Sequence, residues 1–227
     1  GMLGALVHRQ RSGEGQYVDV ALLDSQVGVL ANQALNYLVG GKAPTRLGNA
    51  HPNIVPYQVF PTADSHIIIA TGNDRQWADA CRILGCPELV EDVRFLKNAD
   101  RVANRDALMP LLFARSRLMA RTPLLAALEA ANVPAGPINT VAEVFADPHV
   151  AARGLRVDLP ARDAAGGTVP GVRSPIILSD SPLTHERAAP RHGEHTDAIL
   201  RSLGYGAGEI ELLAALRVID VGPRRAK

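Results

Sequence analysis

Hydrophobic and polar positions follow two different periods along this chain, and each period predicts its own kind of element. Apolar residues recur with helical spacing between 22 and 39, and two glycines at 40 and 41 end this stripe, which predicts a helix. Two short apolar runs at 57–60 and 66–70 flank the turn sequence PTADS, which predicts a β-hairpin. We therefore expect a mixed α/β fold.

The segment after the hairpin carries mostly helical patterns. A helix is expected at 75–84, and helical spacing continues from 87 to 132. In the last helix of this stretch Thr122 is the expected N-cap and Pro123 the first helical residue. Pro110 lies inside the preceding helix and predicts a kink. The other expected elements are helices at 3–11, 195–204 and 208–218 and strands at 16–22, 155–160, 167–172 and 174–179.

Two proline-rich connectors divide the chain. The stretch 42–56 carries three prolines and no hydrophobic period, which is typical of a linker. The stretch 133–150 is similar, except that Thr140 and Glu143 have the spacing of a capping box and predict a short helix. The connectors separate a helix-plus-strand piece, an α/β insert, and a strand-plus-helix return.

Composition narrows the class of protein. The chain has 24 basic and 23 acidic residues and a formal net charge of +1, so nothing favours a nucleic-acid partner. No apolar run approaches the roughly 18 residues of a membrane span, and no secretory signal is visible at the N-terminus. Cys81 and Cys86 fit neither a zinc site nor a redox pair and are expected as buried or partly buried free thiols. We expect a cytoplasmic protein.

Clusters of titratable residues offer little chemistry on their own. The histidines at 185, 192 and 195 lack the spacing that places two metal ligands on one helical face, so we expect no metal site. Asp19 and Asp24 lie on different predicted elements, and Asp24 at a helix start is explained by the helix dipole. Neither pattern predicts an active site.

The loop after the second strand is the strongest candidate site. Gly72, Asn73 and Asp74 connect a strand to a helix, and Gln76 follows in the first turn. Backbone N–H groups at such a helix start can bind an anion or an oxyanion. A plain N-cap, which needs only Asn or Asp, explains the same residues. The sequence leaves both interpretations open.

Five ordered blocks resemble one protein family, the class III coenzyme A transferases, which include formyl-CoA transferase and carnitine CoA-transferase. The blocks are HRQRSGEGQYVDVALLDS (8–25), LGNAHPNIVPYQVFPTAD (47–64), IIIATGNDRQW (67–77), VPAGPINTVAEVFADPHVAARGL (133–155) and GEHTDAIL (193–200). The resemblance covers nearly the whole chain, but it matches only the C-terminal portion of the family's longer members.

The resemblance implies an activity, a site and an assembly. The family transfers coenzyme A between an acyl-CoA thioester and a carboxylic acid, has no permanently bound cofactor, and forms interlocked homodimers. Its nucleophilic aspartate is expected upstream of Gly1, so we expect the 227-residue chain alone to be inactive. A glycine-rich loop that shields the covalent intermediate matches residues 72–76, which makes Gly72, Asn73, Asp74 and Gln76 the expected active-site loop.

The family architecture also implies a domain division. Residues 1–41 and 150–227 would belong to a large nucleotide-binding-like α/β domain. Residues 56–145 would form a smaller inserted α/β domain, and residues 42–55 and 146–149 would be the linkers between them.

Two alternative functions remain at this level. A 2-methylacyl-CoA racemase belongs to the same superfamily, but such enzymes place a glutamate base near this loop, where this chain has Asp74. The chain could also be a non-catalytic partner subunit. The residues do not define the acyl donor, the acceptor acid, or whether this chain binds coenzyme A alone.

Overall fold

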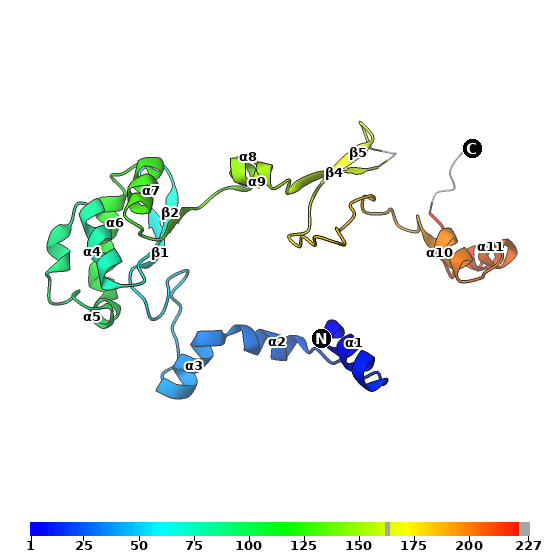
Figure 1. Ribbon diagram of the computed structural model, residues 1–227, viewed down its shortest axis with the longest axis horizontal. Coiled ribbons are helices and arrows are strands. Elements are labelled where there is room, and N and C mark those ends of the chain that lie inside the picture. The colour runs from blue at the N-terminus through cyan, green and yellow to red at the C-terminus, as the bar shows by residue number, and fades with distance from the viewer. Residues whose placement is uncertain (162–163, 223–227) are drawn as a thin grey trace. The chain divides into compact units, whose positions relative to one another are not determined.

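The computed structural model describes residues 1–161 and 164–222, which form a mixed α/β structure (Figure 1). The chain divides into two compact units, Gly1–Ile138 and Asn139–Lys227. The domain division inferred from the family resemblance, with linkers at 42–55 and 146–149, stays a prediction.

A three-stranded antiparallel sheet forms the centre of the first unit. Its strands are β1 (Tyr57–Pro61), β2 (His66–Ala70) and β3 (Ala135–Pro137), in the order β1-β2-β3. The first two strands confirm the predicted hairpin, with Val59 opposite Ile68. The third strand lies in a stretch predicted as a connector. Its three residues are too few for a hydrophobic period, and it exists because Gly136 pairs with Ile68.

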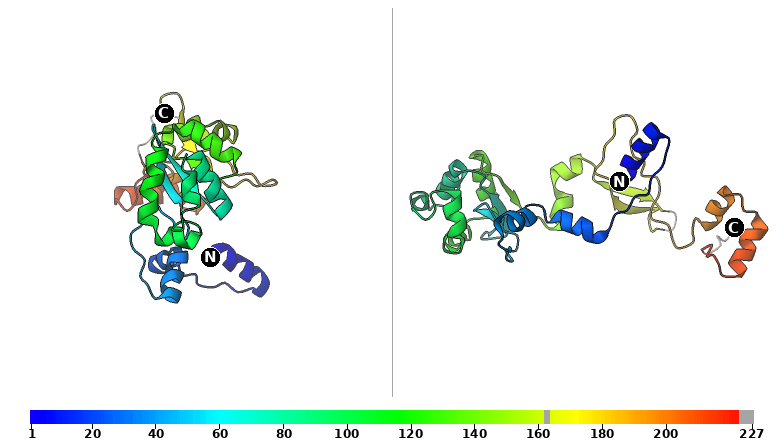
Figure 2. Two further views of the ribbon diagram at one scale, coloured as in Figure 1. Left: turned by 90° about the vertical axis from the view of Figure 1, so that its left-hand side faces the viewer. Right: turned by 90° about the horizontal axis from the view of Figure 1, so that it is seen from below.

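Helices pack on this sheet and enclose the main hydrophobic core (Figure 2). They are α4 (Asp74–Ile83), the 3₁₀ helix η1 (Pro87–Val90), α5 (Asn98–Ala103), α6 (Arg105–Ser116) and α7 (Arg121–Ala130). In α4 the buried residues Trp77, Ala80 and Cys81 follow the spacing of one helical face. Phe60 from the sheet and Leu112 from α6 belong to the same core.

The start of α7 differs from its prediction. The N-cap is Ala120 rather than Thr122, so Pro123 is the third helical residue instead of the first. A side chain distant in the sequence explains the shift, because the Asp64 carboxylate accepts a hydrogen bond from the Arg121 N–H at 2.8 Å. Asp64 therefore binds one of the donors that a local N-cap would otherwise satisfy.

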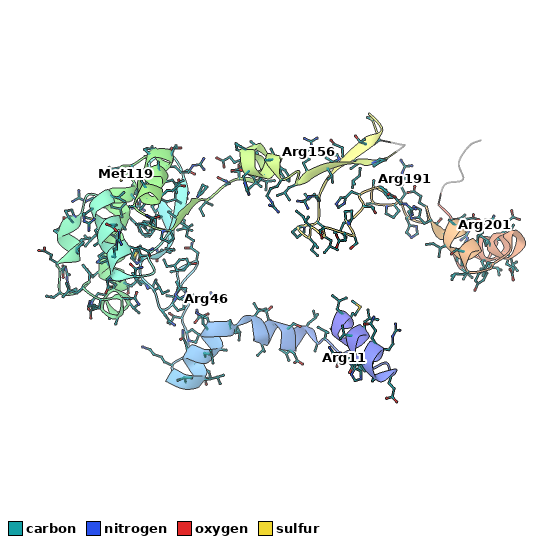
Figure 3. All side chains as sticks on the ribbon, in the orientation of Figure 1. Arg11, Arg46, Met119, Arg156, Arg191 and Arg201 are labelled. Carbon is teal, nitrogen blue, oxygen red and sulfur yellow. The ribbon has the colours of Figure 1, made fainter. Side chains whose placement is uncertain are left out.

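The N-terminal region is helical but contributes nothing to the core. It contains α1 (Met2–Ser12), α2 (Leu22–Val29) and α3 (Ala31–Gly40). The long predicted helix is thus divided, and Ala31 adopts a positive φ of 44° at the break. Residues 1–54 are all described, and none has a buried side chain. Figure 3 draws the side chains that extend from these helices.

Two strands that the hydrophobic pattern predicted are absent from the described residues. The stretches 16–22 and 174–179 form no strand. Alternation alone does not produce a strand, because its backbone groups need a neighbouring strand with which to pair. Neither stretch has such a neighbour in the part of the chain that the structure describes.

The second unit combines short helices with a second hairpin. Its elements are α8 (Val141–Ala146), α9 (Pro148–Ala152), β4 (Arg156–Pro160), β5 (Thr168–Val172), α10 (Thr196–Ser202) and α11 (Ala207–Ala215). The capping box of Thr140 and Glu143 is confirmed. The sequence analysis missed α9, although Asp147 before Pro148 is an N-cap signal, and its carboxylate accepts the N–H groups of residues 149 and 150.

Cys81 and Cys86 are buried free thiols, as predicted. A hydrogen bond with Cys86 and burial raise the pKa of the Cys81 thiol, so it stays protonated and unreactive. None of the helices that the structure describes is both long enough and apolar enough to span a membrane.

Candidate functional site

The candidate loop leaves the sheet from an anchored point. At the end of β2 the buried Thr71 donates two hydrogen bonds to the carbonyl oxygen of Pro56, from its N–H at 2.9 Å and from its hydroxyl at 3.1 Å. The next residues, 72–75, are exposed, and Trp77 returns the chain to the core. A short exposed loop is therefore held between two buried residues.

Asn73 caps the helix that follows the loop. Its side-chain oxygen accepts a hydrogen bond from the Gln76 N–H at 2.9 Å, and its backbone is extended. The N-cap interpretation of the sequence is therefore confirmed for Asn73. This finding leaves the second interpretation open, because a cap and an anion site can share one helix start.

Gln76 connects the loop to a distant part of the first unit. Its side-chain oxygen accepts the Gly72 N–H at 2.7 Å, and its side-chain nitrogen donates to the Asn132 carbonyl at 3.1 Å. Asn132 has a positive φ of 54° between α7 and β3. Sequence pattern does not predict this contact, because its partners are 56 residues apart.

These contacts decide which loop N–H groups are open to a ligand. The Gly72 N–H is occupied by Gln76, so it is not an open donor in this structure. Within the described residues, the N–H groups of Asn73 and Asp74 donate no hydrogen bond. Both lie at the positive end of the dipole of α4, where a negative oxygen is stabilised. The loop thus offers adjacent exposed donors, among them the N–H groups of Asn73 and Asp74.

Asp74 faces a cationic pair rather than the open donors. Its carboxylate accepts a hydrogen bond from Arg101 at 3.0 Å and one from Lys97 at 3.3 Å. The Arg101 hydrogen bond is the main cause that lowers the pKa of Asp74, and Lys97 adds to it. Asp74 therefore stays ionised at neutral pH and is a weaker base than a free aspartate.

The other candidate residues do not form a second site. The His192 imidazole lies 3.1 Å from the Asp220 carboxylate, but its side chain is 88% exposed, in agreement with a solvated loop histidine. Among the described residues, no group of three histidine, cysteine, aspartate or glutamate side chains is placed to hold a metal ion. Asp19 and Asp24 are both exposed.

Comparison with known proteins defines the class to which this fold and loop belong. Residues 1–196 match the family described as CoA-transferase family III. The chain belongs to this family.

Two curated relatives illustrate the similarity. The chain is 52% identical over 199 residues to a succinate–glutarate CoA-transferase from Agrobacterium fabrum, covering 88% of this chain and 49% of the relative. It is 37% identical over 220 residues to a succinyl-CoA:glutarate CoA-transferase from Mus musculus, covering 96% of this chain and 50% of the relative. The chain thus spans about half the length of the curated relatives it matches.

Solved structures agree with this assignment. A CAIB/BAIF family protein from Brucella suis superimposes with a TM-score of 0.71 at 50% identity, over 89% of this chain and 52% of that protein. Rv3272 from Mycobacterium tuberculosis superimposes with a TM-score of 0.70 at 29% identity, over 86% of this chain and 51% of that protein.

The Asp74 ion pairs predict a pH-dependent contribution to stability. Because the pKa of Asp74 is lower in the folded state than the roughly 3.9 of an unfolded aspartate, its carboxylate stabilises the fold above that pH. The contribution is lost as the pH falls through the folded-state pKa. Asp74→Asn should therefore lower the free energy of unfolding at pH 7, by about 1 kcal/mol for a half-exposed pair. The difference from the wild type should vanish in acid.

Urea unfolding followed by fluorescence of Trp77, the only tryptophan in the sequence, measures this difference. Asp106→Asn is the matched control, because Asp106 also lies in the first turn of a helix but forms no ion pair among the described residues. A loss of stability that is equal for both variants, or that persists in acid, would contradict the prediction.

Proposed function

We propose that this protein exchanges coenzyme A between an acyl-CoA thioester and a carboxylic acid. The observation that carries the proposal is the family match over residues 1–196, together with 52% identity to a succinate–glutarate CoA-transferase. Other relatives are named as succinyl-CoA:mesaconate and acetyl-CoA:oxalate CoA-transferases. Succinate, glutarate, mesaconate and oxalate are all dicarboxylates, so we propose succinyl-CoA as donor and a short dicarboxylate as acceptor.

The proposed chemistry follows the covalent route that the family resemblance implies. An aspartate carboxylate attacks the thioester carbonyl, forms a mixed anhydride and releases the coenzyme A thiolate. The thiolate then attacks the aspartyl carbonyl, which gives an aspartyl-CoA thioester and frees the donor acid. The acceptor carboxylate takes the place of that acid and the steps run in reverse. Coenzyme A is a substrate here, and we propose no permanently bound cofactor.

The loop at residues 72–76 has two proposed roles in this route. The open N–H groups of Asn73 and Asp74 would stabilise the oxyanion that forms when a carboxylate attacks a carbonyl. The loop would also exclude water, which would otherwise hydrolyse the anhydride or the thioester. Gly72 and Gln76 would support the loop, since their mutual hydrogen bond closes it.

The contacts of Asp74 favour a transferase over the racemase alternative. A racemase needs a base that removes a proton next to the thioester carbonyl. Asp74, the acidic residue of the loop, is held by Arg101 and Lys97, and its pKa is lowered. Both facts make it a poor base. A non-catalytic partner subunit remains the second alternative, and the exchange assay below distinguishes it from a transferase.

We further propose a homodimer located in the cytoplasm. Apolar side chains of α2 and α3 are largely exposed, for example Leu22 at 90% and Val39 at 86%, so a partner surface would stabilise them. The interlocked arrangement and the division into a large domain (1–41 and 150–227) and a small domain (56–145) come from the family resemblance. Two free thiols agree with a reducing compartment.

An exchange assay tests the proposed function. The native polypeptide, including any sequence that precedes Gly1, should convert succinyl-CoA and glutarate to glutaryl-CoA and succinate, and acetate should be a poor acceptor. The 227-residue polypeptide alone should show no exchange, because the nucleophile is expected upstream of Gly1. Turnover by the 227-residue polypeptide would refute that placement. Epimerisation of a 2-methylacyl-CoA without exchange would favour the racemase, and no reaction at all would favour the partner subunit.

The loop itself is tested by Gly72→Ala in the native polypeptide. Gly72 is not among the glycines with positive φ, and an added Cβ would lie 3.3 Å from the side-chain oxygen of Gln76. Only a small movement of that side chain is needed, so folding should be little affected. Moving Gln76 would disturb its hydrogen bond with Gly72 and so the neighbouring N–H groups of Asn73 and Asp74. Losing one aligned oxyanion donor costs on the order of a hundredfold in rate. We expect the melting temperature to stay within a few degrees, as for a change of about 1 kcal/mol or less, while kcat falls or acyl-CoA hydrolysis rises. A loss of stability with an unchanged rate would show that the loop serves only as the N-cap of α4 and has no catalytic role.

The proposed dimer is tested by measuring mass in solution. Multi-angle light scattering of the purified 227-residue polypeptide should give a mass of at least two chains, because the exposed apolar side chains of α1–α3 drive association. Exchanging Leu22 and Val39 for glutamate should shift the mass toward one chain. A soluble monomer at high concentration in the unaltered polypeptide would contradict the proposal.

A further inference from the structure

Arg101 in α5 is a charged side chain in the interior of the first unit. Its side chain is 1% exposed. A buried cation is costly unless its N–H groups are hydrogen-bonded and its charge is paired. Three backbone carbonyls accept from it: Val55 at 2.8 Å, Phe95 at 3.0 Å and Leu96 at 3.3 Å. The remaining contact is the 3.0 Å hydrogen bond to Asp74.

These acceptors come from separate parts of the chain. Val55 precedes β1, residues 95 and 96 precede α5, and Asp74 is the first residue of α4. The guanidinium carbon of Arg101 also lies 5.1 Å from the centre of the Trp77 ring, one turn further along α4. A planar guanidinium can serve these directions at once, which a lysine ammonium cannot. Arg101 therefore holds the first turn of α4 through both Asp74 and Trp77.

The contact with Asp74 differs from the other three. The other three contacts are with backbone carbonyls, whereas the Asp74 contact is with a side chain. That side chain is 46% exposed and belongs to the candidate loop. Asn73 fixes the loop from within, and Gln76 also binds the Asn132 carbonyl. Among the described residues, the Asp74 contact is the ion pair that joins the loop to a buried side chain. The direction of the Asn73 and Asp74 N–H groups therefore depends in part on where Arg101 holds the Asp74 carboxylate.

We infer that Arg101 is a positioning residue for the loop at residues 72–76, acting through the Asp74 carboxylate. This inference rests on the proposed function of the loop. Arg101 touches no reacting atom in the proposed route. It presets the two open N–H groups, so that they need not reorganise when an oxyanion forms.

Backbone hydrogen exchange on the 227-residue polypeptide tests the positioning without any assay of activity. Arg101→Lys keeps the positive charge but loses the planar fork, and Asp74→Asn removes the negative charge at the loop end of the contact. In each variant the amides of Gly72, Gln76 and Trp77, which donate hydrogen bonds within the loop, should exchange about tenfold faster or more, while amides of β1 and β2 keep their rates. The double variant should add little to the effect of Asp74→Asn, because both changes remove the contact between Arg101 and Asp74. Arg94→Lys is the matched control, since Arg94 also contacts an aromatic ring, that of Phe95, but binds Asp92 away from the loop.

Two results would overturn the inference. Unchanged exchange of the Gly72, Gln76 and Trp77 amides in Asp74→Asn would show that the contact does not hold the loop, and this variant alone decides the case if Arg101→Lys fails to fold. Faster exchange across the whole unit would show a purely structural role. In the native polypeptide we expect kcat to fall about tenfold or more with little change in KM. Faster loop exchange with unchanged kcat would support the positioning and refute the catalytic role of the loop, so the two failures are distinguishable.

Discussion

Burial of apolar side chains between residues 55 and 133 is the constraint on which the rest of the first unit depends. The hairpin supplies Phe60, Ile67 and Ile69 from one side, and α4, α6 and α7 close over them. Because β2 and α4 both enter this core, the exposed loop between them has two fixed ends. The loop can therefore keep a defined shape although its own residues bury little surface.

Hydrogen bonds between residues far apart in the sequence hold segments that the hydrophobic core itself does not fix. Asp64 binds the first N–H of α7, and the Asn98 side chain accepts from Val55 and donates to the Asn53 carbonyl. Arg101, which lies in α5 like Asn98, donates a hydrogen bond to the Val55 carbonyl. The stretch before β1, proline-rich and without a hydrophobic period, is thus held to the folded unit by hydrogen bonds from side chains that its own sequence does not contain.

Membership of CoA-transferase family III gives these contacts a functional setting. The chain covers about half of its curated relatives, and residues 1–54 bury no side chain among themselves. We propose that a nucleophile outside residues 1–227 forms the covalent intermediate, and that the loop after β2 shields this intermediate from water. In that setting the ion pair of Arg101 with Asp74 links a buried charge to the exposed part of the proposed site.

The sequence by itself determined the elements whose signals are local. The hairpin at 57–70 and the capping box of Thr140 and Glu143 depend on residues a few positions apart, so pattern and spacing were sufficient. For α4 the sequence offered Asn or Asp as the cap, and the structure identifies Asn73. Tertiary structure decided the rest. The pairing of β3, the Asp64 contact at the start of α7, the occupation of the Gly72 N–H, and the burial of Arg101 against Asp74 each depend on three-dimensional neighbours. A hydrogen bond between residues 27 or 57 positions apart leaves no periodic trace in the chain, because it forms only after the core has brought its partners together.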